Sequence, residues 1–238
     1  MNIVPTFMGA HATAKEFNGD SDKYIDFVID TVLPEVKAQG IAEFCDIFTE
    51  KGVFDARQTE KLLNRARELG FKLKMHADEI HNSESAALAC RLGCTSADHL
   101  LHVSENGIKA FADSNTIATL LPATAFSLRE PYAPARKLID GGAAVAVASD
   151  FNPGSCFCNS IPLLIALATI NMSMTVNEII SAMTVNAAAA VDRLSSVGSI
   201  EVGKQADFLI LRWNDVEFLS YYIAGKNIDS LYIRGEKA

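Results

Sequence analysis

Short segments of strand type alternate along the chain with segments of helical type, and this alternation restricts the fold more than any other feature. Four strand-type segments end in polar residues that follow one another at intervals of 23, 25 and 26 residues: His76, His99, Thr124 and Asp150. Such an interval accommodates one strand and one crossover helix. We therefore expect an α/β fold with a parallel sheet. The interval alone fits a (β/α) barrel and a doubly wound sheet equally well.

The local pattern predicts where the individual elements lie. Apolar runs with strand character cover residues 2–11, 41–50, 71–79, 94–100, 116–124 and 143–151. Helical spacing of apolar residues predicts helices over residues 22–39, 60–69, 83–92, 134–139, 161–168, 176–183 and 186–194. After residue 195 the sequence changes to β-branched and aromatic runs, which are typical of two or three short strands. We expect an α/β part over residues 1–195 and a small β appendage over residues 196–238.

The composition is that of a soluble globular protein with a small-molecule substrate. The 238 residues are 49% hydrophobic and 21% charged, and the net charge of −8 disfavours nucleic acid and anionic lipid as partners. The chain has no apolar run of the roughly 18 residues that a membrane span needs, and its N-terminus lacks a secretory signal. The five cysteines lack the spacing of a zinc ribbon. We expect a cytoplasmic protein, and these numbers leave room for a homo-oligomer.

Histidines and acids gather at the carboxyl ends of the expected strands. His11, His76, His99 and Asp150 each close or nearly close a strand-type segment, and Glu79 follows His76 by three positions. In parallel α/β folds this end of the sheet carries the active site. Imidazole and carboxylate are ligands that Zn²⁺ and Fe²⁺ accept. A single histidine is more often a buried residue bonded to backbone, but the recurrence at one rim favours a metal site.

The residues after His76 have to be weighed separately. Glu79 lies just beyond the expected strand, where its carboxylate could move a proton at a water molecule or a substrate. An exposed loop acid, or a charge before the next helix, is equally consistent with its spacing. Asp78 and His81 have no counterpart at another strand end, and we expect both to be loop residues.

The stretch SDFNPGS, residues 149–155, is a candidate ligand loop. An apolar strand ends there in an acid, and a Pro-Gly turn then exposes backbone amides beside Asn152 and Ser155. These groups could hold a ligand through N–H donors and an amide side chain. A plain turn between a strand and a helix has the same composition.

Six motifs stand together in a fixed order: FMGAH at 7–11, HADE at 76–79, SADHL at 96–100, LLPATAFSL at 120–128, YAPARKLID at 132–140 and ASDFNPGS at 148–155. With these spacings they closely resemble the imidazolonepropionase family of the amidohydrolase superfamily, over essentially the whole chain. The resemblance implies a metal-dependent (β/α)8 TIM barrel with a β-sandwich built from both chain ends. On this reading the six expected strands are the third to eighth of the barrel, and residues 196–238 are C-terminal strands of the sandwich.

The resemblance also implies a reaction and roles for individual residues. The reaction is hydrolysis of 4-imidazolone-5-propanoate to N-formimidoyl-L-glutamate, a step of histidine degradation, with one divalent metal, zinc or iron. His76 and Asp150 match metal ligands, and His99 matches the histidine beside the catalytic water. Positions that match substrate contacts are His11, Glu79, Asn152, Gly154 and Ser155. His99 and Glu79 would handle protons as the amide C–N bond opens, and either could be the base.

Members of that family begin well upstream, with a segment that carries a His-x-His pair of metal ligands and an arginine and a tyrosine that contact the substrate. No His-x-His occurs in this chain. Two ligands are fewer than a catalytic zinc site normally takes, so we expect little or no turnover from this chain alone. The alternatives are a non-catalytic partial barrel that needs a partner chain, and an amidohydrolase or deaminase acting on another cyclic amide or amidine. The motifs ASDFNPGS and GAH favour imidazolonepropionase over those relatives.

Overall fold

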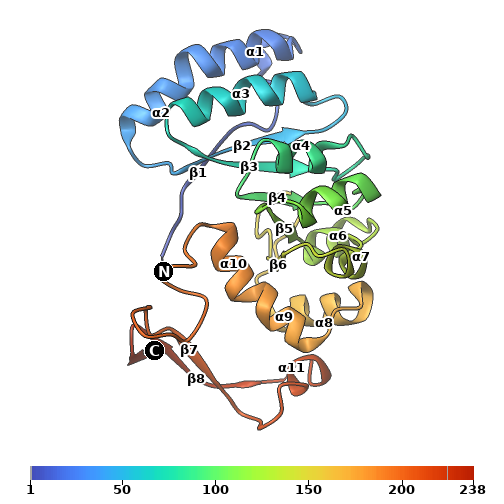
Figure 1. Cartoon of the computed structure of the whole chain (residues 1–238), viewed down its shortest axis with the longest axis vertical. Coiled ribbons are helices and arrows are strands. Elements are labelled where there is room, and N and C mark those ends of the chain that lie inside the picture. The colour runs from blue at the N-terminus through green and yellow to red at the C-terminus, as the bar shows by residue number, and fades with distance from the viewer. Residues whose placement is uncertain (1, 224) are drawn as a thin grey trace. The chain divides into compact units, whose positions relative to one another are not determined.

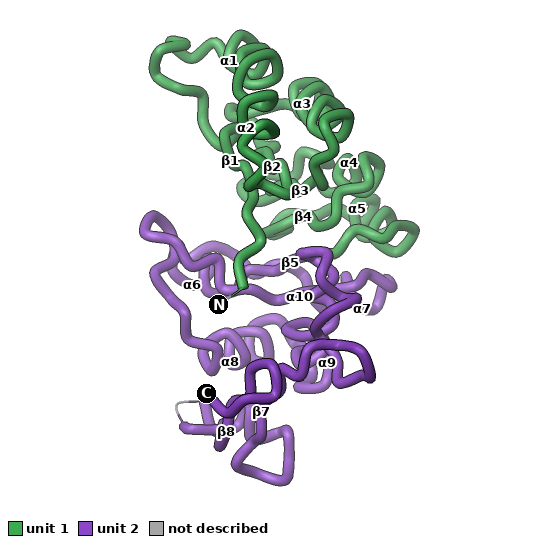
Figure 2. Tube along the Cα trace, turned by 90° about the vertical axis from the view of Figure 1, so that its left-hand side faces the viewer, with its two compact units in different colours: residues 1–118 green, residues 119–238 purple. Residues whose placement is uncertain are grey.

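The computed structural model in Figure 1 describes residues 2–223 and 225–238. The chain forms two compact units, residues 1–118 and residues 119–238 (Figure 2). Strands β1 to β6 follow one another in the main sheet in sequence order, and β7 to β9 form a separate three-stranded sheet. The expected parallel α/β sheet and the small β sheet that follows it are therefore confirmed. Within the described residues, the helices are too short or too polar to cross a membrane.

The strands of the first unit pair in parallel, each with the next along the chain. They are β1 Thr6–Ala10, β2 Phe44–Thr49, β3 Lys72–Ala77 and β4 Ser96–His99, and β5 Ile117–Leu120 crosses from the first unit into the second. The register places Ala77 opposite His99 and Phe48 opposite His76. The carboxyl ends of β3 and β4 therefore lie level, as a shared site requires.

Helices cover the sheet of the first unit, and in Figure 1 α1, α2 and α3 lie together beside its first strands. The helical segments are η1 Lys15–Phe17, α1 Ser21–Phe27, η2 Val28–Val32, α2 Leu33–Gln39, α3 Ala56–Glu68, α4 Ser85–Arg91 and α5 Glu105–Ala112. The helix expected over residues 22–39 is present as α1, a π-helical segment η2 and α2 in direct succession, and it ends at Gly40 with φ 66°. Sequence periodicity did not predict α5.

Helix α3 begins earlier than the apolar pattern suggested, because its first turn is capped. The Asp55 side chain accepts a hydrogen bond from the Gln58 backbone N–H at 2.8 Å, and Gln58 Oε1 accepts from the Asp55 N–H at 2.9 Å. This reciprocal capping box satisfies two otherwise free N–H groups. Leu62 and Leu63 on the inner face of the helix are fully buried. Each such side chain contributes about 1.5–3 kcal/mol relative to an exposed one.

The second unit contains one further parallel strand and a series of helices. These are α6 Pro122–Leu128, α7 Ala135–Asp140, β6 Val145–Val147, α8 Ile161–Met172, α9 Val176–Met183 and α10 Val185–Ala190. The expectation of a strand continuing to Thr124 is wrong. Strand β5 ends at Leu120, and Pro122 opens α6 in its first turn, where its missing N–H costs nothing. Thr124 therefore lies inside a helix.

The rest of the second unit combines an apolar cluster with a small antiparallel sheet. Leu164 and Leu167 of α8 pack with Ala123 of α6 and Cys156. The sheet and its connecting helix are β7 Phe208–Leu211, α11 Phe218–Tyr221, β8 Ile228–Ile233 and β9 Glu236–Lys237. The rings of Phe208 and Tyr232 stack across β7 and β8 with centroids 4.6 Å apart. A division of the chain near residue 195 stays a prediction.

Candidate metal centre

Three neighbouring strands of the first unit bring His11, Asp46 and His76 together. His11 directly follows β1, Asp46 lies within β2, and His76 is the penultimate residue of β3. Side chains alternate along a strand, so Asp46 shares a face of β2 with Phe48, which pairs in register with His76. The same alternation directs Asp46 and His76 to one face of the sheet.

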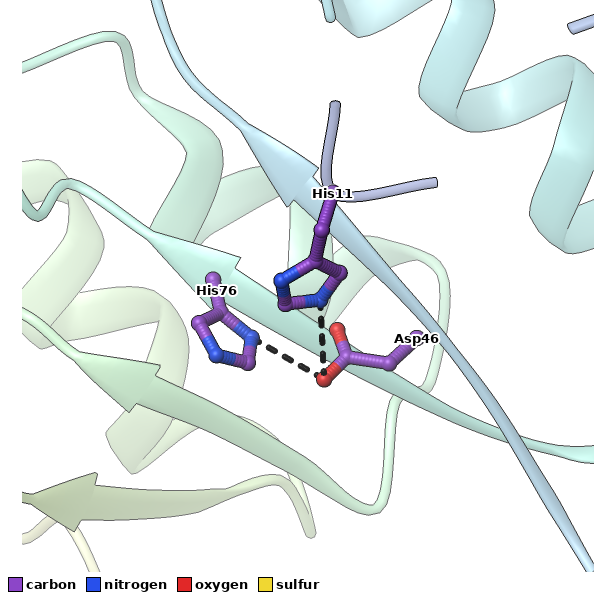
Figure 3. Close-up of side chains that lie close together, drawn as sticks. All are labelled: His11, Asp46 and His76. Carbon is purple, nitrogen blue, oxygen red and sulfur yellow. Dashed lines mark ion pairs between the residues drawn. The ribbon is translucent and has the colours of Figure 1, made fainter. Parts of the chain in front are cut away.

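The three side chains converge on one another (Figure 3). One ligand atom from each lies within 4.8 Å of the other two. Asp46 Oδ2 is 2.9 Å from His76 Nδ1 and 3.8 Å from His11 Nε2. Among the described residues no hydrogen bond of acceptable geometry reaches His11 Nε2, His76 Nδ1 or Asp46 Oδ1, although all three atoms are buried. Buried polar atoms normally have partners, so this cluster has unused coordinating capacity.

Burial makes the charges of this cluster depend on one another. Burial would raise the pKa of Asp46, but His76 and His11 outweigh it and hold that pKa well below its usual range. Burial would also lower the pKa of His76, yet Asp46 raises it to about 9. The Asp46 side chain is 3% exposed and that of His76 is 15% exposed, so solvent screens the pair only weakly. A bound cation would take the place of the proton in this pair.

The donor set fits a divalent transition metal. Two imidazole nitrogens and one carboxylate oxygen are the protein ligands of many catalytic zinc sites and of non-haem ferrous sites. Three ligands leave coordination positions for water and substrate. The first unit thus supplies three donors within one compact unit. The predicted pair of His76 and Asp150 would supply two.

His99 and Glu79 lie beside this cluster. The His99 ring centroid is 5.0 Å from that of His76, and His99 Nδ1 is 3.4 Å from Glu79 Oε1. Strand alternation would direct His99 to the face opposite His76, but its backbone is left-handed with φ 79°. Such a conformation is unusual for a non-glycine residue and is often found at functional sites. Burial foremost, and then His76, lowers the pKa of His99 to about 3, so its imidazole is neutral at neutral pH.

Asp150, the other predicted metal ligand, belongs to the second unit. It follows β6 with a left-handed backbone, φ 50°, and its Oδ2 accepts a hydrogen bond from Thr124 Oγ1 at 2.7 Å. A hydrogen-bonded carboxylate has a fixed orientation, as ligating carboxylates usually do. Thr124 thus contacts a predicted site residue from α6 rather than from a strand end.

The predicted ligand loop folds around Asn152. Its Oδ1 accepts hydrogen bonds from the backbone N–H groups of Gly154 at 2.9 Å and Ser155 at 2.8 Å. Its Nδ2 donates to the Asp150 carbonyl oxygen at 2.8 Å. The amide side chain and both N–H groups thus form hydrogen bonds within the loop. This is the arrangement of a plain turn, which the composition of residues 149–155 also fitted.

Sequence reasoning did not single out Asp46. The signal was present, because Asp46 interrupts the apolar run FCDIF in a strand that is buried at most positions. A carboxylate is rarely buried without a partner, so an acid inside such a strand predicts a nearby cation or histidine. The periodicity of the chain points to residues at strand ends, whereas Asp46 lies inside its strand. The positions of His11, His76, Glu79 and His99 within one unit agree with the expected rim.

Solved structures define the class of fold. A triazine hydrolase variant superimposes with a TM-score of 0.72 at 14% identity, over 98% of this chain and 59% of that one. A zinc-bound adenosine deaminase from Xanthomonas campestris gives a TM-score of 0.69 at 18% identity, over 97% of this chain and 59% of that one. At these identities the likeness shows a common fold, the barrel type of the amidohydrolases.

The sequence profile of the Amidohydrolase family matches residues 37–236, and the chain belongs to this family. Its curated relatives include imidazolonepropionases. The one from Parabacteroides distasonis is 55% identical over 99% of this chain and 57% of its own length. The one from Clostridium tetani is 55% identical over 98% of this chain and 56% of its own length. The chain thus spans little more than half of the curated relatives that it matches.

Proposed function

We propose that this chain carries residues of an imidazolonepropionase site, which opens the ring of 4-imidazolone-5-propanoate to give N-formimidoyl-L-glutamate in histidine degradation. The 55% identity to enzymes of that name supports the substrate. The observation that carries the proposal is the convergence of His11, Asp46 and His76, with His99 and Glu79 beside them. We further propose a cytoplasmic enzyme.

The proposed cofactor is one divalent cation, zinc or iron. In the first unit His76, Asp46 and His11 would hold it. Asp150 of the second unit stays the metal ligand that the resemblance implies. Such a cation, when bound, lowers the pKa of a water molecule and polarises a carbonyl group. His11 has two candidate roles, as a ligand in this cluster and as the substrate contact that the resemblance implies.

The chain's own residues would handle the protons of the reaction. His99 lies beside the metal cluster with its ring 5.0 Å from that of His76, and its neutral imidazole would take a proton from an attacking water. Glu79 Oε1 lies 3.4 Å from His99 Nδ1, where its carboxylate can stabilise the imidazolium that results. One of the two then returns a proton to the ring nitrogen as the amide C–N bond breaks. On the basis of the resemblance, and not of the loop's own hydrogen bonds, we propose that Asn152, Gly154 and Ser155 contact the substrate.

A chimera tests this function in a full-length background. This chain would replace the matching part of the Parabacteroides distasonis imidazolonepropionase, and loss of the imidazolone would be followed by absorbance. We expect ring opening by the chimera and a fall in kcat of about 10²- to 10⁴-fold in its His99→Asn variant. A folded, metal-loaded chimera without hydrolysis would refute the proposal.

The chain by itself serves as the second arm of this experiment. It contains no His-x-His pair, which the resemblance assigns to the metal site. We therefore expect little or no turnover from the purified chain, even when it binds a cation. Hydrolysis of imidazolonepropionate by the chain alone at a rate near that of the chimera would contradict this expectation.

A further inference from the structure

The loop that joins β3 to α4 carries Glu79, and it is built around two buried acids that the proposed mechanism does not use. Asp78 belongs to the loop itself and is 0% exposed, and Glu50, directly after β2, is 2% exposed. A buried carboxylate is costly unless it accepts hydrogen bonds or pairs with a cation. The hydrogen-bond partners of Asp78 and Glu50 identify the parts of the loop that these two residues hold in place.

Glu50 binds the part of the loop that follows Glu79. Its Oε2 accepts hydrogen bonds from the backbone N–H groups of Ile80 at 2.9 Å and His81 at 3.2 Å. Its Oε1 accepts from the Lys51 N–H at 2.8 Å and lies 3.0 Å from His81 Nδ1. Although burial acts in the opposite direction, these bonds lower the pKa of Glu50. The carboxylate is therefore ionised at neutral pH and ties the residues after Glu79 to the end of β2.

Asp78, which directly precedes Glu79, is bonded to the residues at the start of α4. It has a left-handed backbone, φ 46°, and its own N–H donates to Ser85 Oγ at 2.8 Å. Its Oδ1 accepts from the backbone N–H groups of Ser83 at 2.9 Å and Ser85 at 3.2 Å, and its Oδ2 accepts from the Ala86 N–H at 3.2 Å. Both neighbours of Glu79 in the sequence are thus immobilised.

We propose that Glu50 is a positioning residue that holds Glu79 towards His99. Glu79 Oε1 lies 3.4 Å from His99 Nδ1. Because the backbone is fixed on both sides of Glu79, only its side-chain torsions lose conformational freedom in this contact. Of the two buried acids, Asp78 belongs to the loop and Glu50 lies outside it. The bonds of Glu50 therefore fix the position of the loop relative to the strands. The chemical use of this geometry rests on the proposed function, whereas the positioning itself does not.

The test compares Glu50→Gln with Glu79→Gln and a matched control, by NMR of the purified chain. Gln keeps the shape of Glu50 but replaces one acceptor oxygen by an N–H donor, which cannot accept from the backbone N–H groups. The control is Glu84→Gln, because Glu84 lies in the same β3–α4 connection, is exposed, and bonds Asn106 instead. The two readouts are the ring ¹⁵N resonances of His99 and the amide hydrogen exchange of Ile80 and His81.

We expect Glu50→Gln to move the His99 resonances in the same direction as Glu79→Gln does, and to accelerate exchange at Ile80 and His81 about tenfold. Glu84→Gln should do neither. If Glu50→Gln does not fold, Glu50→Asp keeps the charge with a shorter reach and should give a partial shift. Unchanged His99 resonances in the folded Glu50 variant would overturn the proposal, and so would unchanged resonances in Glu79→Gln.

Neither readout needs turnover. A chimera that lacks ring-opening activity would therefore contradict the proposed function, while the NMR result would still decide whether Glu50 positions Glu79. A general loosening of the fold would raise exchange throughout β3 as well. We expect exchange at Met75, in the centre of that strand, to stay unchanged.

Discussion

Asp46 Oδ2 lies 2.9 Å from His76 Nδ1, yet the two atoms are not aligned as a hydrogen bond. A short approach without hydrogen-bond geometry is expected where both atoms point at a shared third partner, as metal ligands do. The first prediction follows from this pair. Asp46→Asn keeps the shape but removes the charge, and it should weaken zinc binding by at least about 10- to 100-fold, measured by competition with a chelating dye.

The matched control for Asp46→Asn is Asp98→Asn. Asp98 pairs in register with His76 on the next strand, but its Oδ1 already accepts a hydrogen bond from Ser96 Oγ at 2.9 Å. We expect Asp98→Asn to change zinc affinity much less. Equal losses in the two variants would mean that general charge, and not coordination, governs binding.

The second prediction separates the two candidate roles of His11. The variant His11→Ala removes Nε2, which lies 3.8 Å from Asp46 Oδ2. If His11 is a metal ligand, as the geometry favours, the purified chain should bind substantially less zinc. If it is only a substrate contact, zinc stoichiometry stays the same and the KM of the chimera rises with kcat preserved.

Much of the fold followed from the sequence because local signals agreed with it. The helix over residues 176–183 was predicted with its observed bounds, since Thr175 caps it and its apolar residues keep one period. The segment 22–39 ended at Gly40 as expected. Elements without such signals were misplaced, and Thr124 is the clearest example, because the apolar run LLPA continues across the boundary between β5 and α6.

The site was harder to predict, because tertiary contacts decide it. Histidines at strand ends could be listed from periodicity, but the left-handed turn that brings the His99 ring to 5.0 Å from His76 has no sequence signature in a histidine. Asp46 was missed because it lies within a strand, and its partners are distant in the sequence. Asp78 was expected to be a plain loop residue, and only the structure shows the bonds that organise the loop around it.

The third prediction concerns the hydrogen bond from Thr124 Oγ1 to Asp150 Oδ2 at 2.7 Å. Thr124→Val leaves the carboxylate with one donor fewer and should lower the free energy of unfolding by about 1–3 kcal/mol, measured by urea denaturation. Thr119→Val is the control, because Thr119 Oγ1 is buried without a hydrogen-bond partner among the described residues. Valine at 119 should be neutral or stabilising. A comparable loss at both positions would contradict a specific role for the Thr124 bond.

The fourth prediction is a pH dependence in the second unit. Glu178 caps α9 through Thr175 and pairs with Arg136 at 2.9 Å, and although burial opposes it, these contacts lower the pKa of Glu178 below its ordinary value of 4.5. A lowered folded-state pKa means that the stabilisation is present above pH 4.5 and is lost as the pH falls through the folded-state value. Glu178→Gln should therefore cost about 1 kcal/mol at pH 7 and progressively less below pH 4.5.

Thermal unfolding of Glu178→Gln and wild type between pH 7 and pH 3 measures this dependence. Asp140→Asn provides the comparison, because Asp140 pairs with the same arginine but its side chain is 66% exposed. An exposed pair contributes little, so Asp140→Asn should change the melting temperature less at every pH. A Glu178→Gln effect that does not vary with pH would be inconsistent with this assignment.

The most direct test of the account is the metal content of the purified chain, measured by elemental analysis for wild type, His76→Ala and His102→Ala. His102 is a histidine of the same unit that lies outside the cluster, so it controls for non-specific loss. We predict about one zinc or iron per chain in wild type and in His102→Ala, and almost none in His76→Ala. A chain that binds no metal, or one whose metal survives the loss of His76, would contradict the central claim.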